Sequence, residues 1–429
     1  MPTVNASIIT IGDELLIGQT IDTNSAFIAQ ELNKRGVWVR RRVAVGDVYD
    51  DIRNALDEES KQSEIIIITG GLGPTADDIT KPLLCDYFGG KLVVNEEVLA
   101  HVKYLIEIVF KRTGPILERN LKQAEVPDVC TVLFNERGTA PGMQFSKMVN
   151  GRNVQFFSLP GVPHEMKGLV LKKVIPAIEK SFALPAIVHR TAFTAGAGES
   201  MVAELLKDFE AALPSTIKLA YLPNYGMVKL RLTATGENEA TVKAQVDPLF
   251  LQLQELVKEY LVANEDIGLE NAIGQLLQAK GKTMGTAESC TGGYIAHLVT
   301  SVRGSSNYYK GSVVSYANSI KQQLLGVQQA TLETEGAVSE ATVRQMAAGA
   351  IATIDVDYAL ATSGIMGPDG GTEQKPVGTV WIAAAARLAD GKVVTETQLL
   401  QLRFDRQRNI AMTATQALNF LRKMILRYS

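Results

Sequence analysis

Four consecutive isoleucines, Ile65–Ile68, constrain the fold of this chain more than any other feature of its sequence. A strand without alternating polar residues is buried on both faces, which is typical of a parallel sheet covered by helices on both sides. Three glycines, Gly70, Gly71 and Gly73, follow the run and lead into a segment with a helical pattern. This order predicts a doubly wound α/β domain in the N-terminal part of the chain.

Apolar runs and helical patterns alternate along all 429 residues and indicate three domains. Residues 1–172 form a three-layer α/β domain, 173–263 a small α+β domain, and 264–429 a second three-layer α/β domain. In the small domain, Met227–Thr235 alternates apolar and polar side chains, as a strand with one wet face does. The predicted fold class is α/β, with two three-layer domains joined by a small α+β domain.

Composition argues against several classes of protein. Lys and Arg number 43 against 46 acidic residues, and no basic segment stands out, so nucleic acid is not an expected partner. Three distant cysteines make neither a disulfide framework nor a zinc site, and the four histidines show no metal-ligand spacing. No apolar run reaches the roughly 18 residues of a membrane span, and the start lacks a secretory signal. We expect a cytoplasmic protein with no membrane partner.

The glycine loop after the isoleucine strand predicts an anion site. Glycines let backbone N–H groups approach a phosphate closely, and the start of the next helix adds partial positive charge. Thr75 and Asp78 have the spacing of a capping box. Asp77 and Asp78 would repel a phosphate unless a divalent cation bridges them to it. The alternative is a plain turn whose acidic residues only stabilise the helix start.

Other polar turns follow further strands of the same domain. Ligands of open α/β sheets bind outside the carboxyl ends of the strands, so these turns join the candidate site. The predicted nucleotide-binding residues are Gly12, Asp13, Glu14, Asn24, Asp47, Gly70, Gly71, Gly73, Thr75, Gly161 and Glu165, with Asp77 and Asp78 as metal ligands.

Ser289 is the candidate nucleophile of the C-terminal domain. The segment Thr286–Gly293 leads from a strand into a helix predicted to begin at Gly292. Unpaired backbone N–H groups at a helix start can stabilise a tetrahedral oxyanion. Two alternatives stay open: Ser289 or Thr291 only caps the helix, or the Cys290 thiol, with a depressed pKa, is itself the nucleophile.

A serine hydroxyl needs a base, and Lys321 is the best candidate. A lysine desolvated in a cleft can lose its proton, whereas His297 lies two turns into the helix and points away. Tyr316 would relay or orient the proton. The simpler alternative to this role is that Lys321 is a solvated lysine on a helix and does not act as a base. A second glycine loop, Thr362–Gly371, is suited to a ribose or phosphate, and Arg406 offers a cation for phosphate unless it is merely a surface residue.

Five motifs, taken in this order, make the chain resemble the CinA family over essentially its whole length. They are Gly12-Asp-Glu-Leu15, Gly70-Gly-Leu-Gly-Pro-Thr-Ala-Asp-Asp78, Leu159-Pro-Gly-Val-Pro-His-Glu165, Ala287-Glu-Ser-Cys-Thr-Gly-Gly293 and Gly364-Ile-Met-Gly-Pro-Asp-Gly-Gly371.

The resemblance implies a molybdopterin-binding-like N-terminal domain that hydrolyses ADP-ribose with Mg²⁺, Mn²⁺ or Co²⁺. It implies a KH-like middle domain, although no basic Gly-x-x-Gly loop supports RNA binding here. The C-terminal domain should deamidate nicotinamide mononucleotide without a cofactor. Ser289 carries over as nucleophile, with Tyr316 and Lys321 handling the proton. The other substrate-binding residues are Cys290, Thr291, Gly292, Gly293, Ser306, Asn318, Ser363, Gly364 and Arg406.

These expectations describe a bifunctional pyridine-nucleotide enzyme, and symmetric dimers are common enough that we expect a homodimer. A molybdopterin-handling protein is an alternative that would leave the serine site unexplained. The other alternative is an adaptor linked to competence or DNA damage, with one or both sites inactive.

Overall fold

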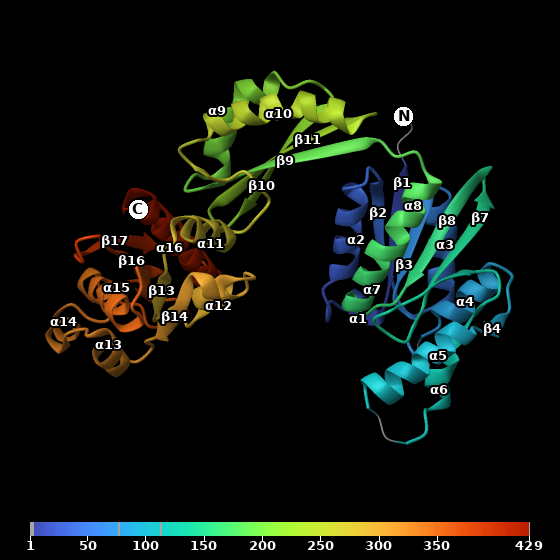
Figure 1. The fold of residues 1–429 in the computed structure, drawn as a ribbon, viewed down its shortest axis with the longest axis horizontal. Coiled ribbons are helices and arrows are strands. Elements are labelled where there is room, and N and C mark those ends of the chain that lie inside the picture. The colour runs from blue at the N-terminus through green and yellow to red at the C-terminus, as the bar shows by residue number, and fades with distance from the viewer. Residues whose placement is uncertain (1–3, 76–77, 112–113, 429) are drawn as a thin grey trace. The chain divides into compact units, whose positions relative to one another are not determined.

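The computed structural model describes residues 4–75, 78–111 and 114–428 (Figure 1). The chain divides into two compact units, residues 1–188 with 234–244, and residues 189–233 with 245–429. Within the described ranges, no helix combines the length and hydrophobicity of a membrane span.

The N-terminal domain is built on a six-stranded sheet. Its elements are β1 (Asn5–Ile11), α1 (Asp13–Leu16), α2 (Thr23–Asn33), β2 (Trp38–Val45), α3 (Tyr49–Ser60), β3 (Ile65–Thr69), α4 (Thr80–Tyr87), β4 (Leu92–Val94), α5 (Glu96–Tyr104), η1 (Leu105–Val109), α6 (Glu118–Leu121), η2 (Lys122–Ala124), β5 (Glu125–Pro127), β6 (Thr131–Leu133), β7 (Gly142–Val149), β8 (Arg152–Leu159), α7 (Pro163–Leu169), η3 (Val170–Val174) and α8 (Ile175–Ser181). The strand order is β2-β1-β3-β8-β7-β6. The first four strands are parallel, whereas β7 and β6 are antiparallel to their neighbours.

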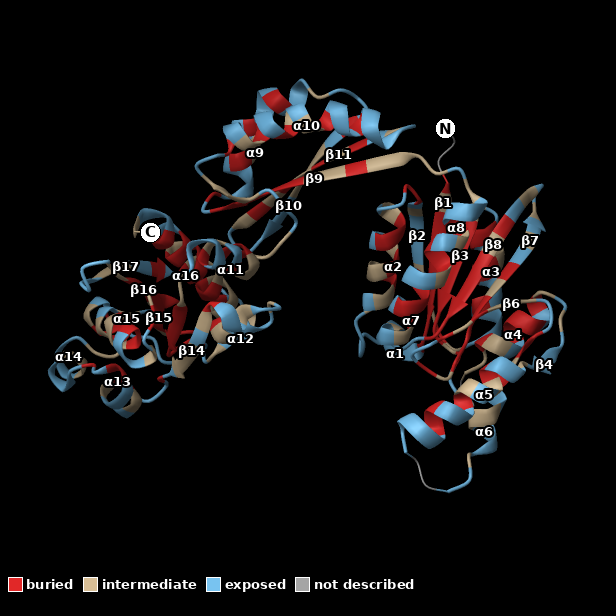
Figure 2. Ribbon diagram, in the orientation of Figure 1, coloured by how far each residue is buried: buried red, intermediate tan, exposed pale blue. Residues whose placement is uncertain are grey.

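The isoleucine run lies in the middle of this sheet and is fully buried, as predicted (Figure 2). Ile65 and Ile67 belong to a core shared with α2, α7 and α8, whereas Ile66 and Ile68 belong to a core shared with α3 and α4. Because side chains alternate across a strand, one apolar run supplies both faces of the sheet. Burial of each such side chain contributes on the order of 1.5–3 kcal/mol.

The first domain extends past its predicted end at residue 172. Val174, Ile175 and Ile178 pack into the same core as Ile8 and Ile28. The boundary at residue 172 falls inside a continuous helical segment, since α7, η3 and α8 follow one another from Pro163 to Ser181 and α8 still covers the first sheet.

The middle domain is a four-stranded sheet in the order β10-β11-β9-β12 with two helices. Its elements are β9 (Ala186–Ala195), α9 (Glu199–Ala211), β10 (Ile217–Asn224), β11 (Met227–Gly236), α10 (Glu239–Leu256) and β12 (Leu261–Ala263). Strand β11 alternates as predicted, with Val228, Leu230 and Leu232 buried and the residues between them partly exposed. The sequence pattern predicts one long helix over Glu239–Val262, whereas the structure ends α10 at Leu256 and forms the short strand β12 at Leu261–Ala263.

The C-terminal domain is a five-stranded sheet in the order β14-β13-β15-β16-β17. Its elements are α11 (Leu269–Lys280), β13 (Met284–Glu288), α12 (Tyr294–Thr300), η4 (Ser305–Asn307), β14 (Tyr309–Val314), α13 (Asn318–Leu325), α14 (Gln329–Thr334), α15 (Glu340–Ile354), β15 (Tyr358–Gly364), β16 (Thr379–Arg387), β17 (Val393–Gln401) and α16 (Arg406–Tyr428). Helices α11, α12 and α16 share one core with the sheet, and α13 and α15 line the other. This is the predicted three-layer arrangement.

The parallel part of this sheet brings two glycine-containing turns together. Strand β13 pairs with β15, so Glu288 lies opposite Thr362. Ser289, which follows β13, and Ser363, near the carboxyl end of β15, therefore lie at the same edge of the sheet, where a ligand would bind.

Candidate active site

Ser289 lies in a turn between β13 and α12. Its backbone N–H donates to Thr362 O at 3.0 Å, which continues the sheet pairing by one residue. Gly292 and Gly293 follow with φ of 62° and 94°, a left-handed conformation that favours glycine. Helix α12 begins only at Tyr294. The prediction that the helix starts at Gly292, with Ser289 at its N-terminus, was therefore wrong.

The start of α12 is capped by the fully buried carboxylate of Glu288, which sequence reasoning missed. This carboxylate accepts hydrogen bonds from the hydroxyls of Thr286 (3.2 Å) and Thr291 (2.7 Å) and from the backbone N–H groups of Gly293 (3.1 Å), Ile295 (3.0 Å) and Ala296 (2.8 Å). The helix N–H groups expected to face an oxyanion are thus occupied. An acidic residue at the end of a buried strand, directly before a glycine turn, was the available signal.

Lys321 reaches Ser289 from α13, as predicted. Its Nζ donates to Ser289 Oγ at 3.1 Å, to Ser315 O at 2.7 Å and to Tyr316 O at 3.4 Å. The side chain is 1% exposed, and burial lowers the pKa of the amine because it disfavours the charged form. In the neutral amine, two N–H bonds satisfy the carbonyls and the lone pair is left for the serine proton.

Tyr316 lies at the same site in a role other than the predicted one. The residue is 65% exposed, and its hydroxyl accepts a hydrogen bond from Arg406 Nη2 at 3.2 Å. Arg406 also donates from Nη1 to Gly367 O at 2.8 Å. The Tyr316 hydroxyl makes no hydrogen bond to Ser289 or Lys321, so it does not relay their proton in this structure. Its backbone carbonyl, by contrast, helps to hold Lys321.

Eight of the predicted C-terminal residues line one cavity of about 280 Å³, a size suited to a small ligand. They are Ser289, Cys290, Tyr316, Asn318, Lys321, Ser363, Gly364 and Arg406. Six further residues complete the lining: Ile365, Met366, Asp369 and Gly370 of the predicted glycine loop, and Ala337 and Val338, which were not predicted. The cavity combines a serine hydroxyl, a buried amine, a guanidinium and a carboxylate with apolar walls.

Thr291, Gly292 and Gly293 do not line this cavity, contrary to prediction. The Thr291 hydroxyl lies between Glu288 and Thr362 Oγ1, at 2.7 and 2.8 Å. These three residues shape the turn that presents Ser289: Glu288 binds the Thr291 hydroxyl and the Gly293 N–H, and the Gly292 N–H donates to Ser289 O at 3.2 Å.

Ser306 lies at the wrong end of the sheet for the predicted role. It is exposed in η4, just before β14, and β14 runs parallel to β13. Ser289 follows the carboxyl end of β13, whose five residues span roughly 16 Å. Sequence order alone did not reveal at which end of its strand this residue lies.

The Cys290 thiol is poorly suited to act as nucleophile. The residue is 6% exposed, and burial raises the pKa of the thiol to about 12. A thiolate would therefore be scarce at neutral pH, which favours Ser289 over the alternative nucleophile.

The N-terminal domain has a second cavity, of about 120 Å³, at the carboxyl ends of its strands. Four predicted residues line it: Glu14, Asn24, Gly70 and Gly161. Asn24 Nδ2 donates to Gly161 O at 2.7 Å, which joins two turns distant in sequence. The structure thus brings part of the predicted nucleotide site together.

The predicted phosphate loop is occupied by its own carboxylate. Asp78 accepts hydrogen bonds from Gly73 N at 2.7 Å, Thr75 N at 2.9 Å and the Thr75 hydroxyl. Helix α4 begins at Thr80, so the Thr75–Asp78 pair closes the loop and is not a helix capping box. Asp77 lies outside the described residues.

The remaining predicted residues of this domain do not line the cavity. Asp13 and Asp47 each accept the other's backbone N–H at 3.2 Å, and Gly12 N donates to Val45 O. Glu165 accepts from Asn135 at 2.7 Å, and burial raises the pKa of Glu165. Gly71 lies against Thr80, where an added Cβ would come within 2.1 Å of Thr80 Oγ1.

In the part of the chain that the structure describes, no three His, Cys, Asp or Glu side chains form a metal-ligand group.

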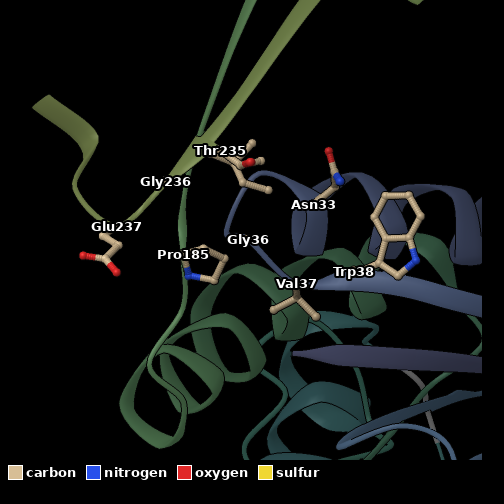
Figure 3. Close-up of a pocket in the computed structure, with 9 residues that line it drawn as sticks. Asn33, Gly36, Val37, Trp38, Pro185, Thr235, Gly236 and Glu237 are labelled. Carbon is tan, nitrogen blue, oxygen red and sulfur yellow. The ribbon is translucent and has the colours of Figure 1, made fainter. Parts of the chain in front are cut away.

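Figure 3 shows another cavity, of about 260 Å³, beside Trp38, Val37 and Pro185. Its lining is largely backbone and apolar surface, with Asn33, Thr235 and Glu237 as polar members. No serine, cysteine, histidine or lysine of the described residues lines it, so we place the candidate chemistry in the other two cavities.

Family models match all three domains. Residues 7–180 match a model described as "Probable molybdopterin binding domain", 189–263 the "Damage-inducible protein CinA KH domain", and 266–425 the "CinA C-terminal domain".

Known relatives match along the whole chain. A CinA-like protein from Cytophaga hutchinsonii is 48% identical over 422 residues, 98% of each chain. A CinA-like protein from Chloroherpeton thalassium is 40% identical over 98% of this chain and 99% of the relative. Among solved structures, the competence/damage inducible protein CihA from Agrobacterium tumefaciens is 38% identical, covering 36% of this chain and 93% of that chain, with a TM-score of 0.35.

Proposed function

The chain belongs to the CinA family, and from this premise we propose that its C-terminal domain deamidates nicotinamide mononucleotide to nicotinate mononucleotide and ammonia. The observation that carries the proposal is the contact of 3.1 Å between the buried Lys321 amine and the Ser289 hydroxyl in a ligand-sized cavity. A serine activated by a desolvated amine is a known arrangement for attack on a carbonyl carbon.

The reaction begins with neutral Lys321 taking the Ser289 proton while Oγ attacks the carboxamide carbon. The tetrahedral intermediate then collapses: the C–N bond breaks, and the lysine ammonium returns the proton to the leaving nitrogen, which departs as ammonia. Water, deprotonated by Lys321, attacks the ester carbonyl, and the Ser289 oxygen leaves as the hydroxyl. Two carbonyls, Ser315 O and Tyr316 O, hold the amine in place throughout.

The developing oxyanion needs N–H donors other than those bound by Glu288. The backbone N–H of Cys290 follows Ser289 directly, borders the cavity and makes no hydrogen bond to another described residue. An N–H next to the nucleophile is a common oxyanion donor. We assign it that role.

Substrate binding is proposed for polar groups at the rest of the cavity. Arg406, held by Gly367 O and the Tyr316 hydroxyl, is suited to the phosphate because a guanidinium binds oxyanions through two N–H groups. The Ser363 hydroxyl donates to Ala337 O at 2.7 Å, so its lone pairs stay available to ribose hydroxyls. Asn318 and Gly364 complete the polar surface.

The N-terminal domain is molybdopterin-binding-like, and we propose that it hydrolyses ADP-ribose to AMP and ribose 5-phosphate. Gly70, Gly161 and Asn24 border the cavity in support of this activity. A divalent cation would be held by Asp78, whose Oδ1 accepts a hydrogen bond from Gly73 N and keeps a lone pair. The ion would neutralise diphosphate charge.

Purified full-length protein should release ammonia from nicotinamide mononucleotide, and Ser289→Ala should abolish release while Cys290→Ala retains it. Absence of ammonia from the wild type across pH 6–10 contradicts the proposal and favours a binding or adaptor role. Cleavage of ADP-ribose with Mg²⁺, Mn²⁺ or Co²⁺, compared with Asp78→Ala, tests the N-terminal site. Cleavage that needs no metal would contradict the metal assignment.

A further inference from the structure

Asp369 is an acidic side chain in the lining of the serine cavity. It belongs to the fifth sequence motif, but the proposed mechanism gives its carboxylate no task. It is exposed, and no hydrogen bond or ion pair holds its carboxylate within the described part of the chain. Lys321 and Arg406 line the same cavity. Lys321 must be neutral to act as base, so Arg406 and Asp369 are the opposite charges that meet a bound ligand.

Asp369 lies in the loop that runs from the serine end of the cavity past its arginine end. The loop starts at Ser363, beside Ser289, and reaches Arg406 at Gly367, whose carbonyl accepts the guanidinium at 2.8 Å. A Cβ added to Gly370 would lie 3.7 Å from Ile365 Cγ2, so the loop folds back on itself at this point. Asp369 thus directly precedes a residue that lies beside Ile365, another member of the cavity lining.

A substrate whose amide carbon lies at Ser289 and whose phosphate lies at Arg406 has its ring between them. Ile365 and Met366 offer an apolar wall for a flat ring. A carboxylate beside such a wall stabilises a ring with a positive charge and does nothing for a neutral ring of similar shape.

We infer that Asp369 is a specificity-determining residue that selects a cationic N-ribosylated pyridinium carboxamide over its uncharged counterparts. The inference rests on the proposed function, since it specifies the substrate class of that same site. Charge complementarity then operates at two points: Arg406 with the phosphate and Asp369 with the ring.

The test compares nicotinamide mononucleotide with its 1,4-dihydro form, which lacks the positive charge but keeps the carboxamide, ribose and phosphate. In wild-type protein and in Asp369→Asn, kcat/KM is measured by ammonia release for both compounds. The ratio between variant and wild type removes the difference in intrinsic reactivity between the two rings.

Asp369→Asn should lower kcat/KM for the cationic compound about fivefold, as for one solvent-exposed ion pair, and leave the value for the dihydro compound unchanged. Glu373→Gln is the matched control: it removes one negative charge from the same loop outside the cavity lining, and both values should stay as in wild type. Equal losses for both compounds, or no loss for either, overturn the inference.

Binding separates this inference from the proposed reaction. In a Ser289→Ala background, calorimetric affinities for the two compounds need no turnover, and adding Asp369→Asn should weaken only the cationic one. A selective loss of affinity supports the role of Asp369 even if the wild type releases no ammonia. If the affinity loss is not selective, the inference is overturned even if the wild type releases ammonia.

Discussion

Replacing Lys321 by methionine removes the proposed base and little else. Methionine is similar in length and apolar, so it can occupy a slot in which the lysine is 1% exposed. Lost general-base catalysis lowers rates by about 10²- to 10⁴-fold, which corresponds to about 3–5 kcal/mol of activation free energy. We expect ammonia release to fall within this range.

The same change should alter stability far less than activity. Ser315 O and Tyr316 O each lose a donor, and an unpaired buried acceptor costs about 1–3 kcal/mol. Part of this is offset, because no amine has to be desolvated. We therefore expect the free energy of unfolding to fall by about 1–2 kcal/mol, measured by urea denaturation followed by circular dichroism.

Lys321→Arg is the control that separates charge from basicity. A guanidinium stays protonated at all accessible pH values, so it keeps the positive charge but cannot accept the serine proton. Activity within tenfold of wild type in either variant, measured as ammonia release by folded protein, would refute the assignment of Lys321 as base.

The pH profile gives an independent check. A base must be neutral to work, so kcat/KM should rise with pH as Lys321 loses its proton. Because burial lowers the pKa of Lys321 from its usual 10.5, the midpoint of the rise should lie below that pH. A rise centred at or above 10.5 would contradict the desolvated amine.

Three further changes test the rest of the site. Cys290→Ala should keep ammonia release within about threefold of wild type, because the thiol is buried and protonated; loss of activity would reassign the nucleophile. Glu288→Gln should lower the free energy of unfolding by about 3 kcal/mol and reduce kcat, because the amide cannot accept from the Ala296 N–H; an unchanged thermal unfolding curve would contradict the capping role. Tyr316→Phe should raise KM about three- to fivefold through the loss of one Arg406 contact, leaving the acid limb of the pH profile in place; a shifted limb would restore Tyr316 to the proton path.

Local sequence patterns were sufficient for the architecture. An uninterrupted apolar strand such as Ile65–Ile68 requires helices on both faces, and alternation in Met227–Thr235 requires one wet face; both were found. Local patterns failed for short elements and for the assignment of a helix to a sheet. Strand β12 was included in a predicted helix, because three residues are too few to show a strand period. Helix α8 was assigned to the wrong domain, because the periodicity of a helix does not show which sheet it covers.

The sequence by itself determined that a hydroxyl and a thiol follow a buried strand at a glycine turn, since residue identity and strand-to-helix order are local properties. Tertiary structure decided which groups meet there. It brought the Lys321 amine across 32 positions to Ser289, gave the N–H groups of α12 to Glu288, and put Ser306 at the opposite end of a parallel pair. Strand neighbours and side-chain directions depend on how distant segments pack, and the local sequence pattern does not show which of these segments come together.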